Sequence, residues 1–474
     1  MAQMDQPKKL SVPVARYRGR IVHLRSSATF PQASCALEFF SDGHLDVDEE
    51  GKIISVGPFE GAPTGFPLID CGDQWIVPGF VDTHLHFPQV YCQASSMGGE
   101  LLEWLDPVIF PAEARLSDRS YARRAAPPFV EALLHAGTTT ALIYGSQFGV
   151  AQEELVLELK RTGMRAIVGR TSQVLGPPTS APLLSDIEST LRSIREEVQW
   201  WHHPVKAGGR IQVAMIPRFA LSFDPQGLTA LGRLYEELRP EGVYFSTHLS
   251  ENNRPGNGEV ATVLRTFGVQ RYLDVYDGFP DGGTARTSPS FLGRRSIFAH
   301  AVHCDASERA RLHETQSGVS HCPQSQLFLG SGTMPIHEFV EAGVALSVGS
   351  DVAAGDTFSI PGVLNTCFKV HRSALRPTIL GGAQLLFLGT LGGARVLDLD
   401  SCVGNLEPGK DATFLVVDPA RDEILAERLR LLESEDDRGE GRLFTLLTHL
   451  RPELIRTRLM VGRPVLSRDC HREP

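Results

Sequence analysis

Short hydrophobic runs recur through the middle of the chain, separated by polar stretches with helical spacing. A run of four to eight apolar residues bounded by turn residues is typical of a buried strand. Eight such runs lie at residues 78–86, 139–144, 165–169, 211–216, 243–248, 296–300, 318–321 and 344–349. Stretches with helical pattern between them include 151–164, 225–239, 307–317 and 335–343. Because strands that alternate with helices favour parallel pairing, eight such units predict an α/β fold, a (β/α)8 TIM-like barrel.

The two ends of the chain have a different pattern. Short alternating runs, interrupted by glycine and proline, lie at residues 15–24, 51–57, 411–417 and 457–466. Period-two alternation is typical of strands with one buried face. We therefore expect a small β-sandwich domain built from both chain termini. The expected boundaries are 1–77 for its N-terminal part, 78–400 for the catalytic barrel and 401–474 for the return to the β-domain.

Composition narrows the class of protein. A chain of 474 residues exceeds the usual limit of a single core, and 42% hydrophobic with 22% charged residues is ordinary for a soluble globular protein. The net charge of −10 argues against a nucleic-acid partner or an anionic membrane surface. No apolar run approaches the length of a membrane span, and no signal peptide is evident. The eight cysteines contain no CxxC pair, which favours reduced thiols and a cytoplasmic enzyme.

Residues with metal-binding chemistry follow the predicted barrel strands. His84 and His86 end the first strand on one face, because side chains alternate along a strand. His248 ends the fifth strand, His300 the sixth, and Asp351 follows the eighth. The carboxyl ends of barrel strands converge on one mouth. We expect His84, His86, His248 and Asp351 to bind one metal ion, a nitrogen and oxygen set that suits Zn²⁺, with Fe²⁺ as second choice.

Two further groups are expected to move or orient protons. A metal of this class lowers the pKa of bound water from 15.7 to about 7. Glu251 lies three residues after His248, within reach of such a water, and is the predicted proton shuttle. His300 is expected to orient the water or the leaving group. Each residue alone also fits an ordinary loop glutamate or hydrogen-bonded histidine, so the prediction depends on the whole set at the strand ends.

Several motifs, in this order and spacing, resemble the amidohydrolase superfamily. They are PGFVDTHLH at 78–86, HLSEN at 248–252, FAH at 298–300, HCP at 321–323 and GSD at 349–351. Within the superfamily, the segments at 84–89, 101–105, 110–113 and 217–220 are similar to those of the guanine deaminase family. The resemblance extends from about residue 70 to 410.

The resemblance implies a specific chemistry. It implies a zinc-dependent barrel with one zinc per subunit, a small-molecule purine substrate and a homodimer. It implies hydrolytic deamination of guanine to xanthine and ammonia, a step of purine catabolism. Metal-bound hydroxide would attack the amine-bearing ring carbon, with Glu251 as proton shuttle and Asp351 or His300 passing on the water proton. The implied substrate-binding residues are Gln89, Arg218 and Phe219, joined by His86, His248, Glu251 and Asp351.

The chain differs from the motifs of the guanine deaminase family at residues 170–174, 324–326 and 353–354. We expect these positions near the barrel mouth, where they would affect the substrate rather than the metal. Related aminopurines or aminopterins, such as 8-oxoguanine, a pterin or an azapurine, therefore stay open as substrates.

Two other readings remain. Cyclic-amide hydrolases share the HxH motif but bridge two metals with a modified lysine after strand four. The only lysines between His84 and Asp351 are Lys160 and Lys206, and neither ends a predicted strand, which favours one metal. A non-catalytic barrel protein would be expected to lack some ligands, whereas the full set is present here.

Overall fold

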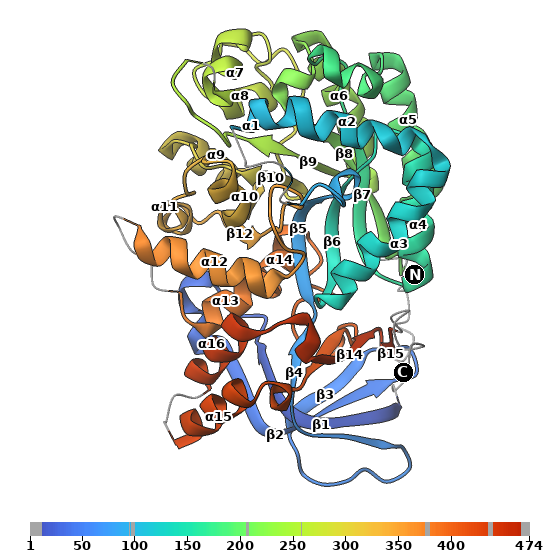
Figure 1. Cartoon of the computed structure of the whole chain (residues 1–474), viewed down its shortest axis with the longest axis vertical. Helices are drawn as coiled ribbons and strands as arrows, with labels where there is room; N and C mark the ends of the chain where they lie inside the picture. Colours follow the sequence, from blue (N-terminus) through green and yellow to red (C-terminus); the bar gives the residue numbers. More distant parts are fainter. Residues whose placement is uncertain are drawn as a thin grey trace, which may run out of the picture.

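The computed structural model describes residues 12–93, 95, 100–204, 208–256, 258–374, 380–434 and 439–465. Lys206 and residue 466, both part of the predictions above, lie outside the described residues, as do the first eleven. The described chain forms a barrel of strands and helices above a smaller sheet (Figure 1). Across these described ranges, no helix is long and apolar enough to cross a membrane.

All eight predicted barrel strands are present, and they pair in parallel in the order of the sequence. They are β5 (Phe80–His86), β6 (Thr138–Gly145), β7 (Arg165–Ser172), β8 (Ile211–Pro217), β9 (Tyr244–Leu249), β10 (Ser296–His300), β11 (Gly318–His321) and β12 (Ala345–Val348). Two backbone hydrogen bonds join the segment that follows β12 to β5. Asp351 N donates to His84 O at 2.8 Å, and His86 N donates to Val352 O at 3.0 Å. The predicted (β/α)8 barrel is therefore confirmed, and its ring is closed at the carboxyl ends of the strands.

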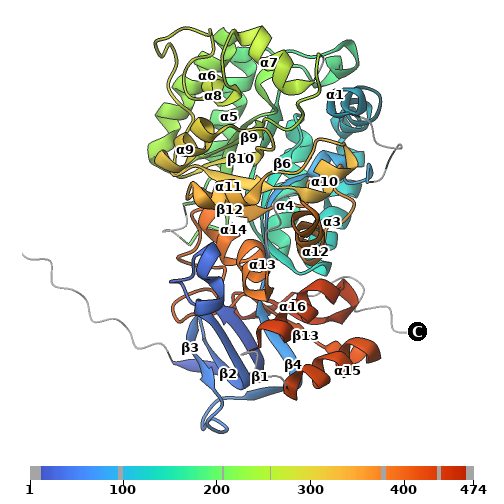
Figure 2. The same ribbon diagram turned by 90° about the vertical axis from the view of Figure 1, so that its left-hand side faces the viewer.

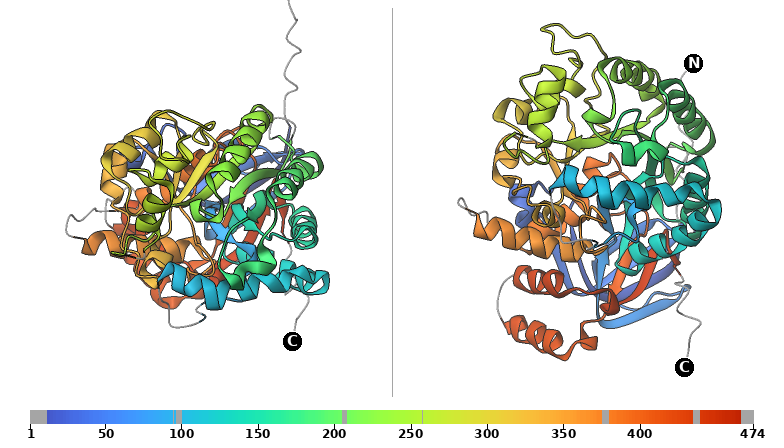
Figure 3. Two further views of the ribbon diagram at one scale, coloured as in Figure 1. Left: turned by 90° about the horizontal axis from the view of Figure 1, so that it is seen from above. Right: turned by 45° about the horizontal axis from the view of Figure 1, so that its top comes forward.

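Helices surround the barrel when it is seen from above (Figure 3). The four predicted helices are α4 (Gly149–Thr162), α6 (Pro225–Leu238), α9 (Ala306–Glu314) and α11 (Ile336–Glu341). Others around the barrel are α3 (Arg119–His135), α5 (Ile187–Trp201), α7 (Glu259–Phe267), α8 (Tyr272–Tyr276), α10 (Pro323–Phe328), α12 (Ile360–Ser373), α13 (Gly382–Gly389) and α14 (Leu391–Val396). The segment after β5 carries the 3-10 turn η2 (Phe87–Gln89), α1 (Leu101–Trp104), the π-helical turn η3 (Leu105–Ile109) and α2 (Phe110–Ala114).

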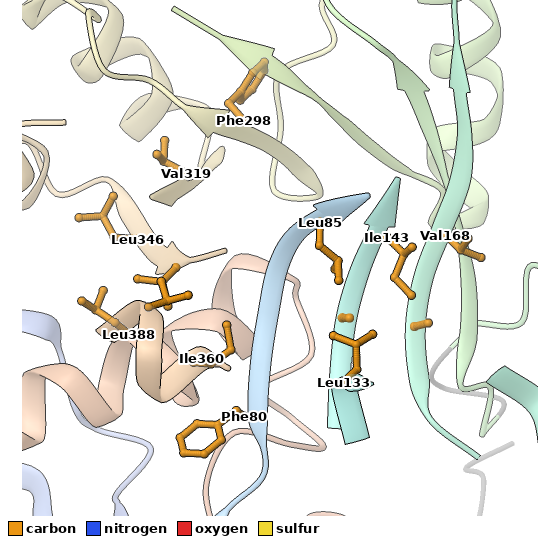
Figure 4. Packing of buried hydrophobic residues seen from close by; sticks show 14 of the residues in the cluster. Phe80, Leu85, Leu133, Ile143, Val168, Phe298, Val319, Leu346, Ile360 and Leu388 are labelled. Atoms are coloured by element: carbon orange, nitrogen blue, oxygen red, sulfur yellow. The ribbon is translucent and has the colours of Figure 1, made fainter. Parts of the chain in front are cut away.

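Alternation along the strands separates two cores. Leu85, Ile143 and Val168, on neighbouring strands, lie in the core that also contains Leu133 of α3 and Ile360 of α12 (Figure 4). Residues of opposite parity fill the barrel interior, closed at its base by α14 and the segment after it. They include Leu142, Ile167, Ala214, Tyr244 and Ile297, joined by Val81, which follows a register shift in β5. Because Leu85 faces outward, His84 and His86 on either side of it face the interior.

The small domain is one mixed sheet from both ends of the chain, ordered β15-β14-β13-β4-β1-β2-β3. Its strands are β1 (Pro13–Leu24), β2 (Leu37–Asp48), β3 (Ile53–Pro58), β4 (Leu68–Pro78), β13 (Phe414–Val417), β14 (Ile455–Met460) and β15 (Arg463–Pro464). Six of these strands contribute side chains to one shared core, which confirms a separate β-domain built from both ends of the chain. The boundaries expected at 77/78 and 400/401 stay a prediction.

The first chain connection between the two parts is a single residue. β4, which lies in the small sheet, ends at Pro78, and β5 of the barrel begins at Phe80 (Figure 2). Gly79 lies between them, where a Cβ would collide with the Thr139 side chain. On the other side, α15 (Glu423–Leu431) is followed by α16 (Glu440–His449), which packs on α12 and α13. The strand that carries His84 and His86 is thus a direct continuation of the small sheet.

Candidate metal and substrate site

The four expected metal ligands meet at the barrel mouth. Oδ1 of Asp351 lies 3.2 Å from Nε2 of His84 and 3.4 Å from Nε2 of His86. Nε2 of His248 lies 3.3 Å from Nε2 of His86. Ligands about 2.0–2.1 Å from a tetrahedral metal are separated by roughly 3.3–3.4 Å. The spacing of these four side chains therefore fits a single ion.

The nitrogens of the site are available for a metal. Nε2 of His84, which faces Asp351, is buried without a hydrogen-bond partner, as is its Nδ1. Nδ1 of His248 lies 2.6 Å from the carbonyl oxygen of Arg218, which can only accept, so this nitrogen carries the proton. Nε2 of His248 then has its lone pair free to face the cluster. Unpaired buried nitrogens of this kind fit a bound cation.

Burial and mutual proximity favour the protonation states that a metal needs. Burial lowers the pKa of His248 well below its usual range, and the neighbouring imidazoles lower it further. Burial also lowers the pKa of His86, and it lowers that of His300 to about 3. Burial tends to raise the pKa of Asp351, but His84, His86 and His300 outweigh it and hold this pKa well below its usual range. Neutral imidazoles beside an ionised carboxylate are the form that binds metal.

Glu251 lies beside this cluster. Its Oε2 is 3.4 Å from Nε2 of His300, which in turn lies 3.8 Å from Oδ2 of Asp351. Burial, together with the nearby carboxylates of Asp351 and Glu259, raises the pKa of Glu251 well above its usual range. A carboxyl group that holds a proton near neutral pH can act as both acid and base.

The backbone at the mouth is unusual at the same positions. Ser250, His300, Ala301 and Asp351 have φ values of 48°, 71°, 50° and 48°. Left-handed conformations at residues other than glycine cost free energy and concentrate at functional sites. They occur here where β9, β10 and β12 end, and they turn the chain just as its side chains enter the mouth.

A small pocket opens beside the cluster. All the expected substrate residues line it: His86, Gln89, Arg218, Phe219, His248, Glu251 and Asp351. His300, Leu101, Trp104, Leu105, Leu329 and Ala354 complete most of the remaining wall. Its mixture of apolar and polar walls is typical of a small-molecule site. The structure therefore brings every sequence-predicted side chain to one place, with His84 directly behind the wall.

Two buried glutamates were not anticipated as site residues. Glu113 on α2 accepts a hydrogen bond of 3.0 Å from Nε2 of Gln89 and pairs with Arg218. Glu259, the first residue of α7, accepts hydrogen bonds from the backbone N–H groups of Glu251 and Asn252 at 2.9 and 3.2 Å. The sequence pointed to only one of them, because Glu113 lies in the segment 110–113 that is similar to the guanine deaminase family.

Asp82 is a third supporting carboxylate. It lies inside the barrel and accepts hydrogen bonds from the backbone N–H of His84 at 3.2 Å and of Ser350 at 3.1 Å, and from the Ser350 hydroxyl at 2.5 Å. Burial raises its pKa to about 6, against the effect of these hydrogen bonds. Asp82 thus ties the strand that carries two ligands to the residue that precedes Asp351.

Only one of the three departures reaches the pocket. The backbone N–H of Ala353 donates to Oε1 of Gln89 at 3.1 Å, and Ala354 lines the pocket. Arg170, expected near the mouth, instead pairs with buried Glu197 of α5 between strand and helix. Gln324 on α10 donates to Thr366 of α12. Arg170 therefore joins a strand to a helix and Gln324 joins two helices, whereas Gln173 lines a neighbouring hollow together with Leu105 and Phe219.

A second group of possible ligands lies outside the barrel wall. His321 at the end of β11 is close to Cys367 and His371 of α12, and all three are buried. Nε2 of His321 and Nε2 of His371 are 2.9 Å apart. At this distance one imidazole can donate to the other, while Nδ1 of His321 stays buried without a hydrogen-bond partner.

Comparison with known proteins identifies the family. Residues 75–440 match the model of the Amidohydrolase family. The chain belongs to this family. Its relatives include the guanine deaminase of Escherichia coli, 35% identical over 408 residues that cover 85% of this chain and 87% of that protein. A probable guanine deaminase of Deinococcus radiodurans is 35% identical over 443 residues, covering 91% and 94%. The solved structure of the E. coli enzyme matches this amidohydrolase with a TM-score of 0.85 at 33% identity, over 96% of this chain and all of that one.

Proposed function

We propose that this amidohydrolase is a metal-dependent hydrolase that deaminates guanine to xanthine and ammonia. One observation carries the proposal. The pocket beside the four-ligand cluster is also lined by Glu251, Gln89 and Arg218. A metal site, a proton carrier and hydrogen-bond donors for a heterocycle therefore share one cavity. The similarity to guanine deaminases over most of the chain supports the same substrate.

The proposed metal is a single Zn²⁺ per subunit, with Fe²⁺ as the alternative, held by His84, His86, His248 and Asp351. When bound, such an ion would supply activated water and polarise the substrate. The lysine that would bridge two metals has no counterpart in the described part of the barrel. Strand four, β8, ends at Pro217 and is followed by Arg218, while Lys160 lies on α4.

The side chains of the pocket suit this reaction. Arg218 presents N–H donors that fit the carbonyl oxygen of guanine, and Phe219 packs against the ring. Glu251, protonated because burial raises its pKa, donates to the ring nitrogen beside the amine-bearing carbon. Asp351, or neutral His300 at Oε2 of Glu251, accepts the proton released by water. The group that took the water proton passes one to the departing amine, and the hydroxyl on the tetrahedral carbon returns one to Glu251. A carbonyl oxygen thereby replaces the amine, which leaves as ammonia.

The remaining features of the proposal concern the whole protein. We propose a homodimer on the basis of the family resemblance, and a cytoplasmic location on the basis of the scattered cysteines. The domain boundaries at 77/78 and 400/401 belong to the same proposal. Light scattering on the purified protein tests the oligomeric state directly.

An ammonia-release assay tests the reaction. The metal-loaded protein is incubated with guanine, 8-oxoguanine, an azapurine and a pterin, and ammonia is measured together with metal content. Release from guanine with formation of xanthine is the expected result. Release from a pterin but not from guanine would contradict the substrate while sparing the metal site.

A further inference from the structure

Glu113 joins the two polar residues that the proposed function assigns to the purine. Its side chain is 6% exposed. One oxygen accepts the 3.0 Å hydrogen bond from Nε2 of Gln89, and the other pairs with Nη2 of Arg218. Gln89 follows β5 and Arg218 follows β8, whereas Glu113 lies on α2. We infer that Glu113 is a positioning residue that determines which substrate atoms Gln89 and Arg218 recognise; this inference rests on the proposed function.

The orientation of the Gln89 amide is fixed by two neighbours. The carboxylate of Glu113 can only accept, and the backbone N–H of Ala353, 3.1 Å from Oε1 of Gln89, can only donate. A flipped amide would place its oxygen against the carboxylate and its NH₂ against the Ala353 N–H. The amide therefore keeps one N–H free, and this free donor is available to the pocket. Gln89 accordingly recognises an acceptor atom of the heterocycle, a ring nitrogen or carbonyl oxygen.

Glu113 also neutralises the positive charge of Arg218 in the pocket. Arg218 is 3% exposed, and its guanidinium lies 5.3 Å from the ring centre of Phe110. A buried cation without a partner is costly and would attract anions, but the Glu113 carboxylate balances it. Nε of Arg218 stays buried without a hydrogen-bond partner, so the guanidinium retains donor capacity beyond its pair with Glu113. The pocket is thus built for an uncharged heterocycle with a carbonyl acceptor, and against carboxylated or anionic analogues.

The first test replaces the acceptor at this position. Glu113→Gln removes the negative charge, and its amide can replace only part of the bridge that Glu113 forms between Gln89 and Arg218. We expect KM for guanine to rise about 10- to 100-fold, with kcat changed less than about threefold and metal content unchanged, because the reacting groups are untouched. Glu113→Asp should give an intermediate KM. Glu103→Gln on neighbouring α1, whose side chain is 72% exposed, is the matched control.

A double exchange separates positioning from stability. In Glu113→Gln with Gln89→Glu, the new amide can donate to the new carboxylate, and the Ala353 N–H still has an acceptor. The bridge is restored, but position 89 now presents an acceptor to the substrate. We expect recovery of the melting temperature without recovery of KM for guanine. If KM recovers with stability, or if Glu113→Gln leaves KM within twofold, the inference is wrong.

The same measurements distinguish this inference from the proposed function. Wild-type protein that neither deaminates guanine nor binds it in calorimetry would contradict both. Wild-type protein that deaminates guanine, with a Glu113→Gln variant of unchanged KM, would contradict only the role of Glu113. A fall in kcat and metal content together would assign Glu113 a general structural role instead.

Discussion

Asp351 and His84 meet twice, once through a backbone hydrogen bond and once as two side chains that face the same metal position. The N–H of Asp351 donates to the carbonyl oxygen of His84 at 2.8 Å, and the carboxylate lies 3.2 Å from Nε2 of the same histidine. The backbone bond closes the barrel between its first and last strands. The contact that joins the last part of the barrel to its first strand therefore also brings two metal ligands together.

Replacement of Glu251 should remove turnover while leaving the metal. Glu251→Gln keeps the size of the side chain but cannot carry a proton. General acid–base groups contribute about 10²- to 10⁴-fold, so kcat should fall by at least 100-fold with metal content unchanged. Exposed Glu236→Gln is the control. Wild-type turnover in the Glu251 variant would exclude it as proton shuttle.

Gly349 should be essential for holding the metal. A Cβ at this position would lie 2.7 Å from Oγ of Ser320, 2.8 Å from Cβ of His84 and 2.9 Å from the His84 carbonyl oxygen. Because backbone atoms of a ligand-bearing strand cannot easily retreat, Gly349→Ala should displace His84. We expect metal affinity to fall about 10- to 100-fold in a competition titration with a chelator. Gly57→Ala, where the nearest atom is 3.7 Å away, should retain wild-type affinity.

The purified protein should contain one zinc ion per chain, and removal of the ion should abolish activity. Metal analysis and reconstitution with Zn²⁺ or Fe²⁺ after dialysis against a chelator provide the measurement. A ratio near two would contradict a single-metal site at the mouth, unless the extra ion binds His321, Cys367 and His371. His371→Gln decides between these cases, since only in the second would it reduce the ratio to one.

Acid should destabilise the metal-free protein through His371. Burial lowers its pKa to about 4, whereas an unfolded histidine has a pKa of about 6.5. As pH falls through this window the unfolded chain takes up a proton that the folded chain does not. The contribution of neutral His371 to the free energy of unfolding is fully present above pH 6.5. About 3 kcal/mol of this free energy is lost by pH 4.

Denaturant titrations of metal-free protein at several pH values test this contribution. The free energy of unfolding of His371→Gln should fall less steeply between pH 7 and pH 4 than that of wild type. Exposed His203→Gln controls for the loss of an imidazole. Parallel curves for wild type and His371→Gln would refute the assignment.

The barrel and its ligands could be predicted because each depends on local pattern. Buried strands are continuous apolar runs, and barrel geometry brings whatever follows them to one mouth. The strands β2 and β4 were expected only as β-structure somewhere within residues 15–77, without their own boundaries. Ser41, Asp42 and Gly43 suggest a turn, but β2 continues through them, and β4 has exposed residues over its first half.

The supporting carboxylates were beyond sequence reasoning for a different reason. Glu113 and Glu259 lie on helices, where a glutamate usually faces solvent. Their partners, Gln89 and Arg218 for Glu113 and the backbone of Glu251 for Glu259, are set by tertiary packing. Neither residue type nor spacing encodes such pairing. The same holds for His371, whose partner His321 belongs to another element.

The direct passage from β4 into β5 links the small domain to the metal thermodynamically. One uninterrupted segment pairs with β1 and β13 on one side of Gly79 and carries His84 and His86 on the other. A ligand that binds only the native state stabilises whatever must unfold to release it. Occupancy of the metal site should therefore slow hydrogen exchange and proteolysis in the terminal sheet as well as in the barrel, so that the two halves respond to a chelator as one cooperative unit.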